Sequence, residues 1–334
     1  MSLLVETPGL LTTVQDLGRR GFQHLGVGPG GVMDPVSHRL ANLLVGNPES
    51  AATLEITLAG PSLRFETDAL IALGGADLAP TIEEQPVRLW RPTLVRAGAR
   101  LAFGAPRQGC RCYLALAGGF RLPRVMDSAS TSLAAGFGGF QGRALKRGDR
   151  LDGVPCPRER YPSLWQRFDR GLQPCLALDW FPAWYRELDF LRPAGLRLIP
   201  GPQWPALTAE ARRALLEDSF QVASNSDRMG IRLRGPRLAL ERPMEMLSAG
   251  VATGTLQLPP DGSPILLMAD RQTTGGYPRL GELAGVDLAK AAQLCASDPV
   301  RFTAITLEAA QELLLAREAR FHALARVLAE RQSH

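Results

Sequence analysis

The feature that most constrains this fold is how often glycine and proline interrupt its apolar segments. The chain has 334 residues, of which 34 are Gly and 26 are Pro, and both residues are poorly tolerated inside long helices. Between them lie short runs rich in Leu, Ile and other apolar side chains, which are typical of β-strands. Such runs occupy residues 54–58, 63–65, 69–73, 112–116, 196–199, 255–258 and 265–268. The sequence therefore predicts a mainly β fold.

Helices are predicted at only four places. Three short ones follow a residue that can cap the N-terminus: Asp34 before 35–44, Thr208 before 209–216 and Asp287 before 288–294. The longest begins near Thr306 and places apolar residues on one stripe at helical spacing, namely Leu307, Ala310, Leu314, Phe321, Leu324 and Leu328. We expect this stripe to pack against the body of the protein, with a partner-binding helix as the alternative.

A short sequence echo points to two related lobes. Residues 56–63 and 231–238 both place Ile, Leu, Gly, Pro and Leu at matching positions, which predicts a strand, a Gly-Pro corner and a second strand in each. Convergent turn chemistry gives the same letters and stays an alternative. Because the chain is longer than one core usually needs, we expect an N-terminal domain at 1–155, a linker at 156–192 and a C-terminal domain at 193–334 that ends in the long helix.

Composition and charge exclude several classes of function. The net charge is +5, yet Arg and Lys are scattered among acids without a basic run, so no nucleic-acid partner is expected. The sequence has no signal-peptide pattern and no stretch of about 20 apolar residues, so we expect a cytoplasmic protein without a membrane segment. The four histidines and five cysteines lack metal-ligand spacing, so no metal site is predicted.

Polar residues gather in segments that border the predicted strands. The candidates in the first half of the chain are Gln15, Asp16, Arg19, Gly75 and Asp77, and those in the second half are Asn225, Asp227, Arg228, Asp270, Gln272, Thr273, Thr274, Gly275 and Tyr277. Loops on a rigid β scaffold commonly carry sites, and residues 270–277 hold the richest mixture of polar groups. Structural readings stay open, with Asp16 in a turn that pairs with Arg19 or Arg20 and Asp77 in a β-turn.

A glycine-rich stretch from Gly26 to Asp34 enters the helix predicted at 35–44. Backbone amides and a helix N-terminus in such a place can receive an anion. The stretch lacks the Gly-Lys-Ser/Thr of a Walker loop and the spacing of a dinucleotide-binding loop. A structural loop that leads into a well-capped helix is the alternative.

Eight segments together resemble one known family. They are residues 12–19 (TTVQDLGR), 31–34 (GVMD), 41–47 (ANLLVGN), 73–77 (LGGAD), 113–119 (YLALAGG), 199–203 (IPGPQ), 226–230 (SDRMG) and 272–278 (QTTGGYP). The chain resembles the biotin-dependent carboxyltransferase-like family. That family includes the C subunit of prokaryotic 5-oxoprolinase, also called allophanate hydrolase subunit 2 or the KipI antagonist KipA, and the corresponding part of urea carboxylase.

The resemblance implies two tandem cyclophilin-like β-barrel domains with a few peripheral helices. It implies two protein partners, one KipI-like and one LamB/YcsF-like, and a small-molecule amide as substrate. Together the three proteins are expected to convert 5-oxoproline, ATP and water to glutamate, ADP and phosphate, with the KipI-like protein and this chain activating the lactam by phosphorylation. ATP is therefore expected in the partner complex, and this chain is expected to be active only with its partners.

The family motifs also imply roles for the candidate residues. The resemblance assigns orientation or proton transfer to Asp16, Asp77, Asp227 and Asp270, and anion binding to Arg19, Arg228 and Arg271. Neutral hydrogen bonds to substrate fall to Gln15, Asn225, Gln272, Thr273, Thr274 and Tyr277, with Gly75 and Gly275 allowing close approach. Two positions depart from the family pattern, since Trp204-Pro205 follows Gln203 where an Asp is common, and Ala249 stands where an acidic residue is common.

Two other functions stay open. One is a biotin-dependent carboxyltransferase component that acts on urea or another amide. Neither Lys146 nor Lys290, the two lysines of the chain, lies in the Met-Lys-Met setting of a biotinylated lysine, so no covalent biotin is expected on this chain. The other is a non-enzymatic antagonist that binds a KipI-like regulator of a kinase.

Overall fold

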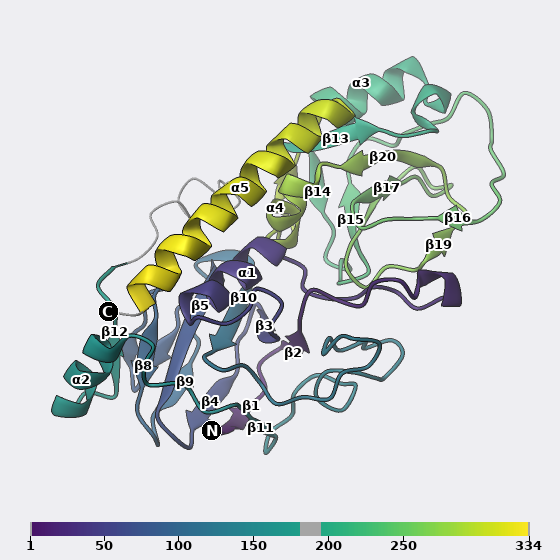
Figure 1. Ribbon diagram of the computed structural model, residues 1–334. Helices are drawn as coiled ribbons and strands as arrows, with labels where there is room; N and C mark the ends of the chain where they lie inside the picture. Colours follow the sequence, from purple (N-terminus) through teal and green to yellow (C-terminus); the bar gives the residue numbers. More distant parts are fainter. Residues whose placement is uncertain (1, 181–194, 333–334) are drawn as a thin grey trace. The chain divides into compact units, whose positions relative to one another are not determined.

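The computed structural model describes residues 2–180 and 195–332 (Figure 1). The chain divides into two compact units, and each is drawn from separate stretches. Unit 1 comprises Met1–Gly18, Asp34–Leu188 and Arg320–His334, and unit 2 comprises Arg19–Met33 and Asp189–Ala319. The linker expected at 156–192 contains a helix and a strand of unit 1, α2 (Pro162–Arg170) and β12 (Cys175–Ala177). Residues 181–192 of that linker lie outside the described residues.

Unit 1 contains two six-stranded sheets that enclose one core. The strand orders are β11-β1-β4-β9-β6-β7 and β12-β8-β5-β10-β3-β2. Side chains of both sheets, among them Leu3, Phe65, Ile71 and Leu114, are fully buried in that core. Its strands are β1 (Ser2–Thr7), β2 (Leu11–Gln15), β3 (Thr53–Thr57), β4 (Ser62–Phe65), β5 (Ala69–Asp77), β6 (Thr81–Ile82), β7 (Gln85–Pro86), β8 (Thr93–Val95), β9 (Arg100–Ala102), β10 (Gln108–Leu116) and β11 (Arg150–Asp152).

Unit 2 contains an eight-stranded sheet and a two-stranded one. The strand order of the larger sheet is β21-β14-β15-β18-β17-β20-β13-β22, with β13 and β22 parallel. Phe220 and Phe302 meet edge to face in its core, with ring centroids 6.2 Å apart. The strands are β13 (Leu196–Pro200), β14 (Phe220–Val222), β15 (Gly230–Arg234), β16 (Ala249–Gly250), β17 (Thr255–Gln257), β18 (Ile265–Leu267), β19 (Thr274–Gly275), β20 (Arg279–Leu283), β21 (Pro299–Val300) and β22 (Phe302–Ala304).

The prediction of a mainly β fold with few helices is confirmed. Each apolar run marked in the sequence overlaps a strand, and these strands are β3, β4, β5, β10, β13, β17 and β18. The sequence echo holds in part. A strand precedes the Gly-Pro corner in both copies, but a second strand follows it only in unit 1, where Gly60-Pro61 leads into β4. In unit 2, Leu238 is buried in the core outside any strand.

Three of the four predicted helices form as expected. Helix α1 (Pro35–Leu44) begins after Asp34, whose Oδ1 accepts hydrogen bonds from Val36 N and Ser37 N, both at 3.0 Å. It packs on β5 and β10 (Figure 1). Helix α3 (Ala209–Glu217) follows Thr208, whose Oγ1 accepts from Ala211 N at 3.1 Å. The long helix is α5 (Leu307–Gln332), and its residues up to Ala319 belong to unit 2 and the later ones to unit 1.

Two details of the helix predictions are wrong. Asp287 does not cap α4 (Leu288–Ala292), because its carboxylate accepts hydrogen bonds from Arg197 Nε at 2.8 Å and Nη2 at 2.6 Å. The predicted stripe on α5 is buried at Ala310 and from Phe321 onward, but Leu307 is 50% exposed and Leu314 36% exposed. The first turns of α5 therefore leave part of the apolar stripe in solvent. Among the described residues, no helix combines the length and the apolar character that a membrane crossing requires.

Helix α1 carries a fully buried histidine in unit 1. Nδ1 of His38 lies 2.9 Å from Thr53 Oγ1, and Nε2 lies 3.4 Å from Nδ2 of Asn42. Burial lowers the pKa of His38 to about 4, and the nearby carboxylates of Asp16 and Glu55 oppose this shift only in part. The ring is therefore neutral at neutral pH, and its contacts hold α1 against β3.

We predict that His38 makes the stability of the protein depend on pH below neutrality. The unfolded chain takes up a proton on this histidine near pH 6.5 and the folded chain only near pH 4, so the stabilisation is complete above about pH 6.5 and is lost as the pH falls toward 4. The loss amounts to about 2 kcal/mol between pH 7 and pH 5. Urea unfolding at a series of pH values measures it, and His38→Gln should flatten the dependence in this window. An equally steep dependence in that variant would contradict the assignment.

Candidate functional site

An ion pair in unit 2 joins two of the predicted site residues. Arg228 is 4% exposed, and its Nε and Nη2 donate to Oδ2 and Oδ1 of Asp270 at 2.8 and 3.0 Å. The same Nη2 donates to the carbonyl oxygen of Gly31 at 2.6 Å, and Asp270 N donates to Arg228 O at 2.9 Å. Strand pairing brings the two residues together. Gly230 of β15 lies opposite Leu267 of β18, and Arg228 and Asp270 lie just beyond this pair, at the same end of the two strands.

The glycine-rich stretch closes on this ion pair. At Gly30, where φ is 58°, a Cβ atom would lie 3.2 Å from Nη1 of Arg19 and 3.8 Å from Oδ1 of Asp270. A Cβ atom at Gly28 would lie 3.1 Å from the carbonyl oxygen of Arg271. Both contacts are tight and Gly30 also has a positive φ, so glycine suits the close packing of this stretch on Arg19, which is 1% exposed. The alternative reading of a loop before a capped helix is supported, because Asp34 occupies the first amides of α1.

Next to the ion pair lies a buried guanidinium group with unsatisfied donors. Arg271 is 5% exposed, and its Nε and Nη1 have no hydrogen-bond partner. Burial lowers the pKa of Arg271, while the charge of Glu282 opposes the shift. Burial also raises the pKa of Glu282, whose two carboxylate oxygens lie 2.8 and 2.9 Å from the hydroxyl of Thr255. The two ionisable groups attract each other but do not form a hydrogen-bonded pair.

An amide from the neighbouring strand adds to this group. Gln257 is 1% exposed, its Oε1 accepts from Gln272 Nε2 at 3.4 Å, and its own Nε2 has no partner. The pairing of β17 with β20 sets Thr255 opposite Glu282 and Gln257 opposite Arg279. The sequence pattern predicted a strand here and no site residue. The signal that marks the site is the polar pair Thr255 and Gln257, which alternates with Leu256 and Leu258.

The rest of the 270–277 loop is held by its backbone. Thr274 and Gly275 form β19 and pair with Gly250 and Ala249 of β16, and Thr273 O accepts from Val251 N at 3.1 Å. A Cβ atom at Gly275 would lie 2.5 Å from Gln257 Nε2, so a larger residue here would displace the buried side chain of Gln257. The side chains of Gln272, Thr274 and Tyr277 are exposed. The loop therefore presents these groups to solvent rather than to a common cavity within unit 2.

Other predicted residues of unit 2 have local structural contacts. Asp227 is exposed, and its Oδ1 accepts from Met229 N at 2.8 Å and Gly230 N at 3.1 Å, as in a tight turn. Asn225 in the same turn is exposed. At the first departure from the family pattern, Oε1 of Gln203 accepts from Arg279 N at 3.1 Å. The second departure, Ala249, lies in β16 opposite Gly275.

In unit 1, Asp16 is the centre of a buried hydrogen-bond network. Its carboxylate accepts from Ser128 Oγ at 2.7 Å, Ser130 Oγ at 2.6 Å, Ala129 N at 2.7 Å and Gly18 N at 2.8 Å. Burial alone would raise the pKa of Asp16, but these hydrogen bonds outweigh burial and hold it below its usual range. The contacts assign Asp16 the structural role that was left open, with serines and backbone amides as donors.

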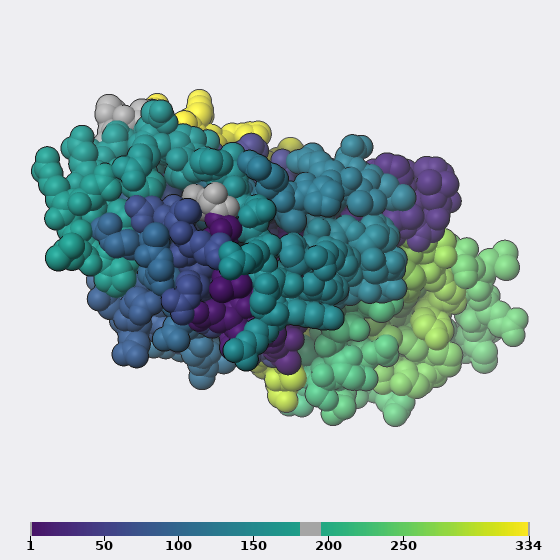
Figure 2. Space-filling model, turned by 90° about the horizontal axis from the view of Figure 1, so that it is seen from below, coloured from purple at the N-terminus to yellow at the C-terminus, as the bar shows by residue number. Residues whose placement is uncertain are grey.

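Gln15 binds the same segment. It is fully buried, and its Nε2 donates to Thr13 Oγ1 at 3.1 Å and to the carbonyl oxygen of Thr131 at 3.2 Å, while its Oε1 has no partner. Together with Asp16 it holds residues 128–131, within a segment from 117 to 149 that contains no regular strand or helix. Figure 2 shows this segment spread over the surface of unit 1. The two residues therefore act as anchors of a long surface segment.

Asp77 lies far from Asp16 in the same unit. One row of paired residues crosses β2, β3, β10 and β5, and it consists of Val14, Leu54, Leu114 and Leu73. From this row, β2 continues toward Asp16 in one direction and β5 continues toward Asp77 in the opposite direction. Oδ1 of Asp77 accepts from Ala79 N at 2.9 Å, and Oδ2 lies 3.7 Å from Arg107 Nη1. Gly75 lies within β5 opposite Cys112. The structure does not bring Asp77 and Asp16 into one site.

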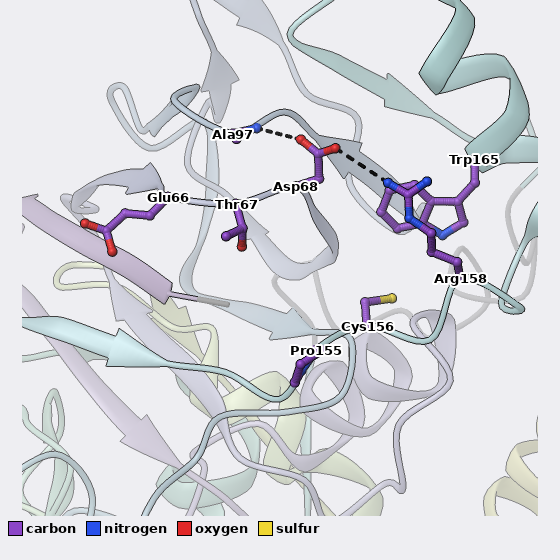
Figure 3. Close-up of a pocket in the computed structure, with 8 residues that line it drawn as sticks. All are labelled: Glu66, Thr67, Asp68, Ala97, Pro155, Cys156, Arg158 and Trp165. Atoms are coloured by element: carbon purple, nitrogen blue, oxygen red, sulfur yellow. Dashed lines mark hydrogen bonds and ion pairs between the residues drawn. The ribbon is translucent and has the colours of Figure 1, made fainter.

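A surface hollow of about 480 Å³ in unit 1 is lined by none of the predicted residues. Figure 3 shows Arg158 flat against Trp165, with its guanidinium carbon 4.6 Å from the ring centroid. Asp68 accepts from Ala97 N at 2.8 Å and lies 3.9 Å from Arg158 Nη2. Burial raises the pKa of the Cys156 thiol to about 11. The charged groups Asp68 and Arg158 thus have partners within the hollow, and the thiol is not activated.

Similarity to known proteins extends over most of the chain. The family described as carboxyltransferase domain, subdomain A and B, matches residues 25–304. The C subunit of 5-oxoprolinase from Escherichia coli K12 is 39% identical over 303 residues, which are 90% of this chain and 91% of that protein. The protein of the same name from Haemophilus influenzae is 33% identical, and the match covers 96% of both chains.

Larger proteins also match, and this chain spans only part of them. Urea amidolyase from Lachancea kluyveri is 30% identical over 96% of this chain and 18% of its own length. The crystal structure of the K. lactis urea amidolyase superposes with a TM-score of 0.84 at 29% identity, over 97% of this chain and 20% of that one. The crystal structure of TTHA0988 gives a TM-score of 0.74 at 35% identity, over 90% of this chain and 55% of that one, so this chain spans about half of it.

We predict that Asp16 and Asp77 differ strongly in their effect on stability. Asp16→Asn places an amide NH₂ against donors that now point at a carboxylate, and should lower the free energy of unfolding by about 2 to 4 kcal/mol. Asp77→Asn keeps a turn acceptor at a partly exposed position and should cost about 0.5 kcal/mol or less. Urea unfolding followed by tryptophan fluorescence measures both. Equal effects would show that the buried network does not distinguish the two carboxylates.

The ion pair in unit 2 gives a further prediction. Arg228→Met and Asp270→Leu each leave one buried charge without its partner and should cost about 3 to 5 kcal/mol. The double variant should be more stable than the sum of the two losses implies, by at least about 1.5 kcal/mol, because no charge is then left alone. A double-mutant cycle of unfolding free energies measures this coupling, and additive losses would contradict the pairing.

Proposed function

The chain belongs to the carboxyltransferase domain family, subdomains A and B, and from this premise we propose that it is the C subunit of an ATP-dependent 5-oxoprolinase. The observation that carries the proposal is coverage in both directions. Two proteins that bear the name of the 5-oxoprolinase C subunit align with this chain over at least nine tenths of both partners. The urea amidolyases align over one fifth or less of their own length.

In this proposal the chain acts in the cytoplasm with a KipI-like protein and a LamB/YcsF-like protein. The KipI-like protein and this chain activate 5-oxoproline with ATP, and the assembly opens the ring to glutamate with release of ADP and phosphate. Phosphoryl transfer to a lactam depends on donors and cations that are already oriented where negative charge develops. Unit 2 offers buried donors to a small amide substrate in Arg271 and Gln257. Arg228 and Asp270, which bind each other, position the loop that carries Arg271.

A second candidate function is carboxyl transfer to urea or another amide. The family description and the TM-score of 0.84 to a urea amidolyase structure favour it. Biotin would then come from another chain, because Lys146 and Lys290 lack the sequence setting of a biotinylated lysine. Lys290, which belongs to α4, also lies 3.9 Å from the buried carboxylate of Asp287.

The test is reconstitution of the full chain with a KipI-like protein and a LamB/YcsF-like protein from the same organism. We predict ATP hydrolysis that depends on 5-oxoproline, with glutamate and ADP formed in equal amounts and no turnover by any of the proteins in isolation. A parallel reaction with urea, bicarbonate and a biotinylated carrier protein tests carboxyl transfer. Absence of lactam-dependent hydrolysis in every combination of the three proteins would refute the proposal.

The two remaining readings give different results in the same experiment. Consumption of urea and carboxybiotin without turnover of 5-oxoproline would identify the carboxyltransferase. Tight binding to the KipI-like protein with neither reaction would identify an antagonist. Asp227→Ala serves as a control in each case, because its carboxylate binds the amides of its own turn and the variant should leave binding of the KipI-like protein unchanged.

A further inference from the structure

Arg271 stands out among the buried charges of unit 2 because its protein surroundings do not satisfy it. The neighbouring Arg228 binds a carboxylate through two N–H groups and a carbonyl oxygen through a third contact. Arg271 is equally buried, yet two of its nitrogens face no acceptor and no carboxylate lies within ion-pair distance of it in the part of the chain that the structure describes. A buried guanidinium without acceptors is strongly unfavourable.

Glu282 does not fill this role. Its oxygens lie at hydrogen-bonding distance from the hydroxyl of Thr255, and that hydroxyl is held in turn by Ala252 N at 2.9 Å. This arrangement keeps Glu282 on the strand pair β17–β20 and leaves it near Arg271 without contact. The Nε and Nη1 donors of Arg271 are therefore left for an anion that is not part of this unit.

Gln257 limits the chemical class of the anion that can bind beside Arg271. Its amide nitrogen is an unpartnered, buried donor, and its amide oxygen takes Gln272, the residue after Arg271. The group offers N–H donors from one cation and one amide, which suits a small, planar, singly charged oxyanion. Glu282 beside it disfavours a more highly charged group such as phosphate, because two nearby anions repel each other.

We propose that Arg271, assisted by Gln257, is the subsite that binds the carboxylate of a small carboxylic-acid substrate. Within the proposed function, on which this assignment of the ligand rests, the carboxylate is that of 5-oxoproline. Arg271 then distinguishes the lactam acid from a simple lactam and orients its ring, while activation of the amide takes place at other groups. Residues on β17 and the 270–277 loop thereby determine specificity.

The experiment compares three probes on the full-length chain by isothermal titration calorimetry: 5-oxoproline, 2-pyrrolidinone, which is the same lactam without the carboxylate, and inorganic phosphate. The wild type should bind 5-oxoproline at least about tenfold more tightly than 2-pyrrolidinone. Arg271→Gln should abolish that preference. Arg242→Gln, which removes the same charge from an exposed position, should keep it.

A second substitution and thermal unfolding serve as controls for misfolding of the Arg271→Gln variant. Arg271→Lys keeps the charge but lacks the planar set of donors, and it should retain part of the preference. Thermal unfolding of both variants should give midpoints no lower than that of the wild type, because the buried Nε and Nη1 of Arg271 donate to no protein acceptor. A lowered midpoint together with an unchanged ligand preference would overturn the proposal and assign Arg271 a purely structural role.

Two further outcomes separate this inference from the proposed function. If the reconstituted complex turns over 5-oxoproline but Arg271→Gln leaves KM and the preference over 2-pyrrolidinone unchanged, the subsite is wrong and the function stands. If no complex is active, acetate serves as the probe on the chain alone, and its loss from Arg271→Gln but not from Arg242→Gln upholds the subsite without the function. Phosphate binding that is lost with Arg271 while the lactam preference persists would assign the site to a phosphoryl group and overturn the proposal.

Discussion

The site in unit 2 depends on the ion pair between Arg228 and Asp270. Two parallel hydrogen bonds fix the end of β18 against the start of β15, and a third ties the glycine-rich stretch to both through the carbonyl oxygen of Gly31. A buried ion pair adds little net stability, since desolvation offsets its attraction, but it specifies one geometry. Because both side chains are occupied by each other, they fix the backbone from which Arg271 projects.

Local features of the fold could be predicted from the sequence and long-range contacts could not. The Asp34 and Thr208 caps act over three residues, so the starts of α1 and α3 can be predicted from neighbouring residues in the sequence. Asp287 has the same local appearance, yet it binds Arg197, which lies 90 positions away. Three of the four donors to Asp16 are likewise more than 100 positions distant. Whether a carboxylate caps a helix or binds a distant segment therefore depends on the tertiary structure.

The candidate site shows the same division. The polarity of the 270–277 loop predicted exposed groups such as Tyr277 as site residues, whereas the buried donors are Arg271, near the start of the loop, and Gln257 in strand β17. A sequence shows which side chains can donate a hydrogen bond, but whether each donor finds an acceptor depends on neighbours across the sheet. Gln257 and Arg271 are distinguished by surroundings that leave their donors unsatisfied, and no local pattern encodes that property.

Stretches of the two units alternate along the chain. Residues 19–33 leave unit 1 to supply Met33 to the core of unit 2, and α5 passes from unit 2 back to unit 1, where Phe321 is buried beneath Arg39. A single break in the gene anywhere between Leu3 and Phe302 therefore leaves at least one core divided between the two products. Neither unit can be exchanged between proteins as one continuous segment, because each is drawn from separate stretches of the chain. Recombination that transfers this module must carry it whole, from the first strand to the last helix.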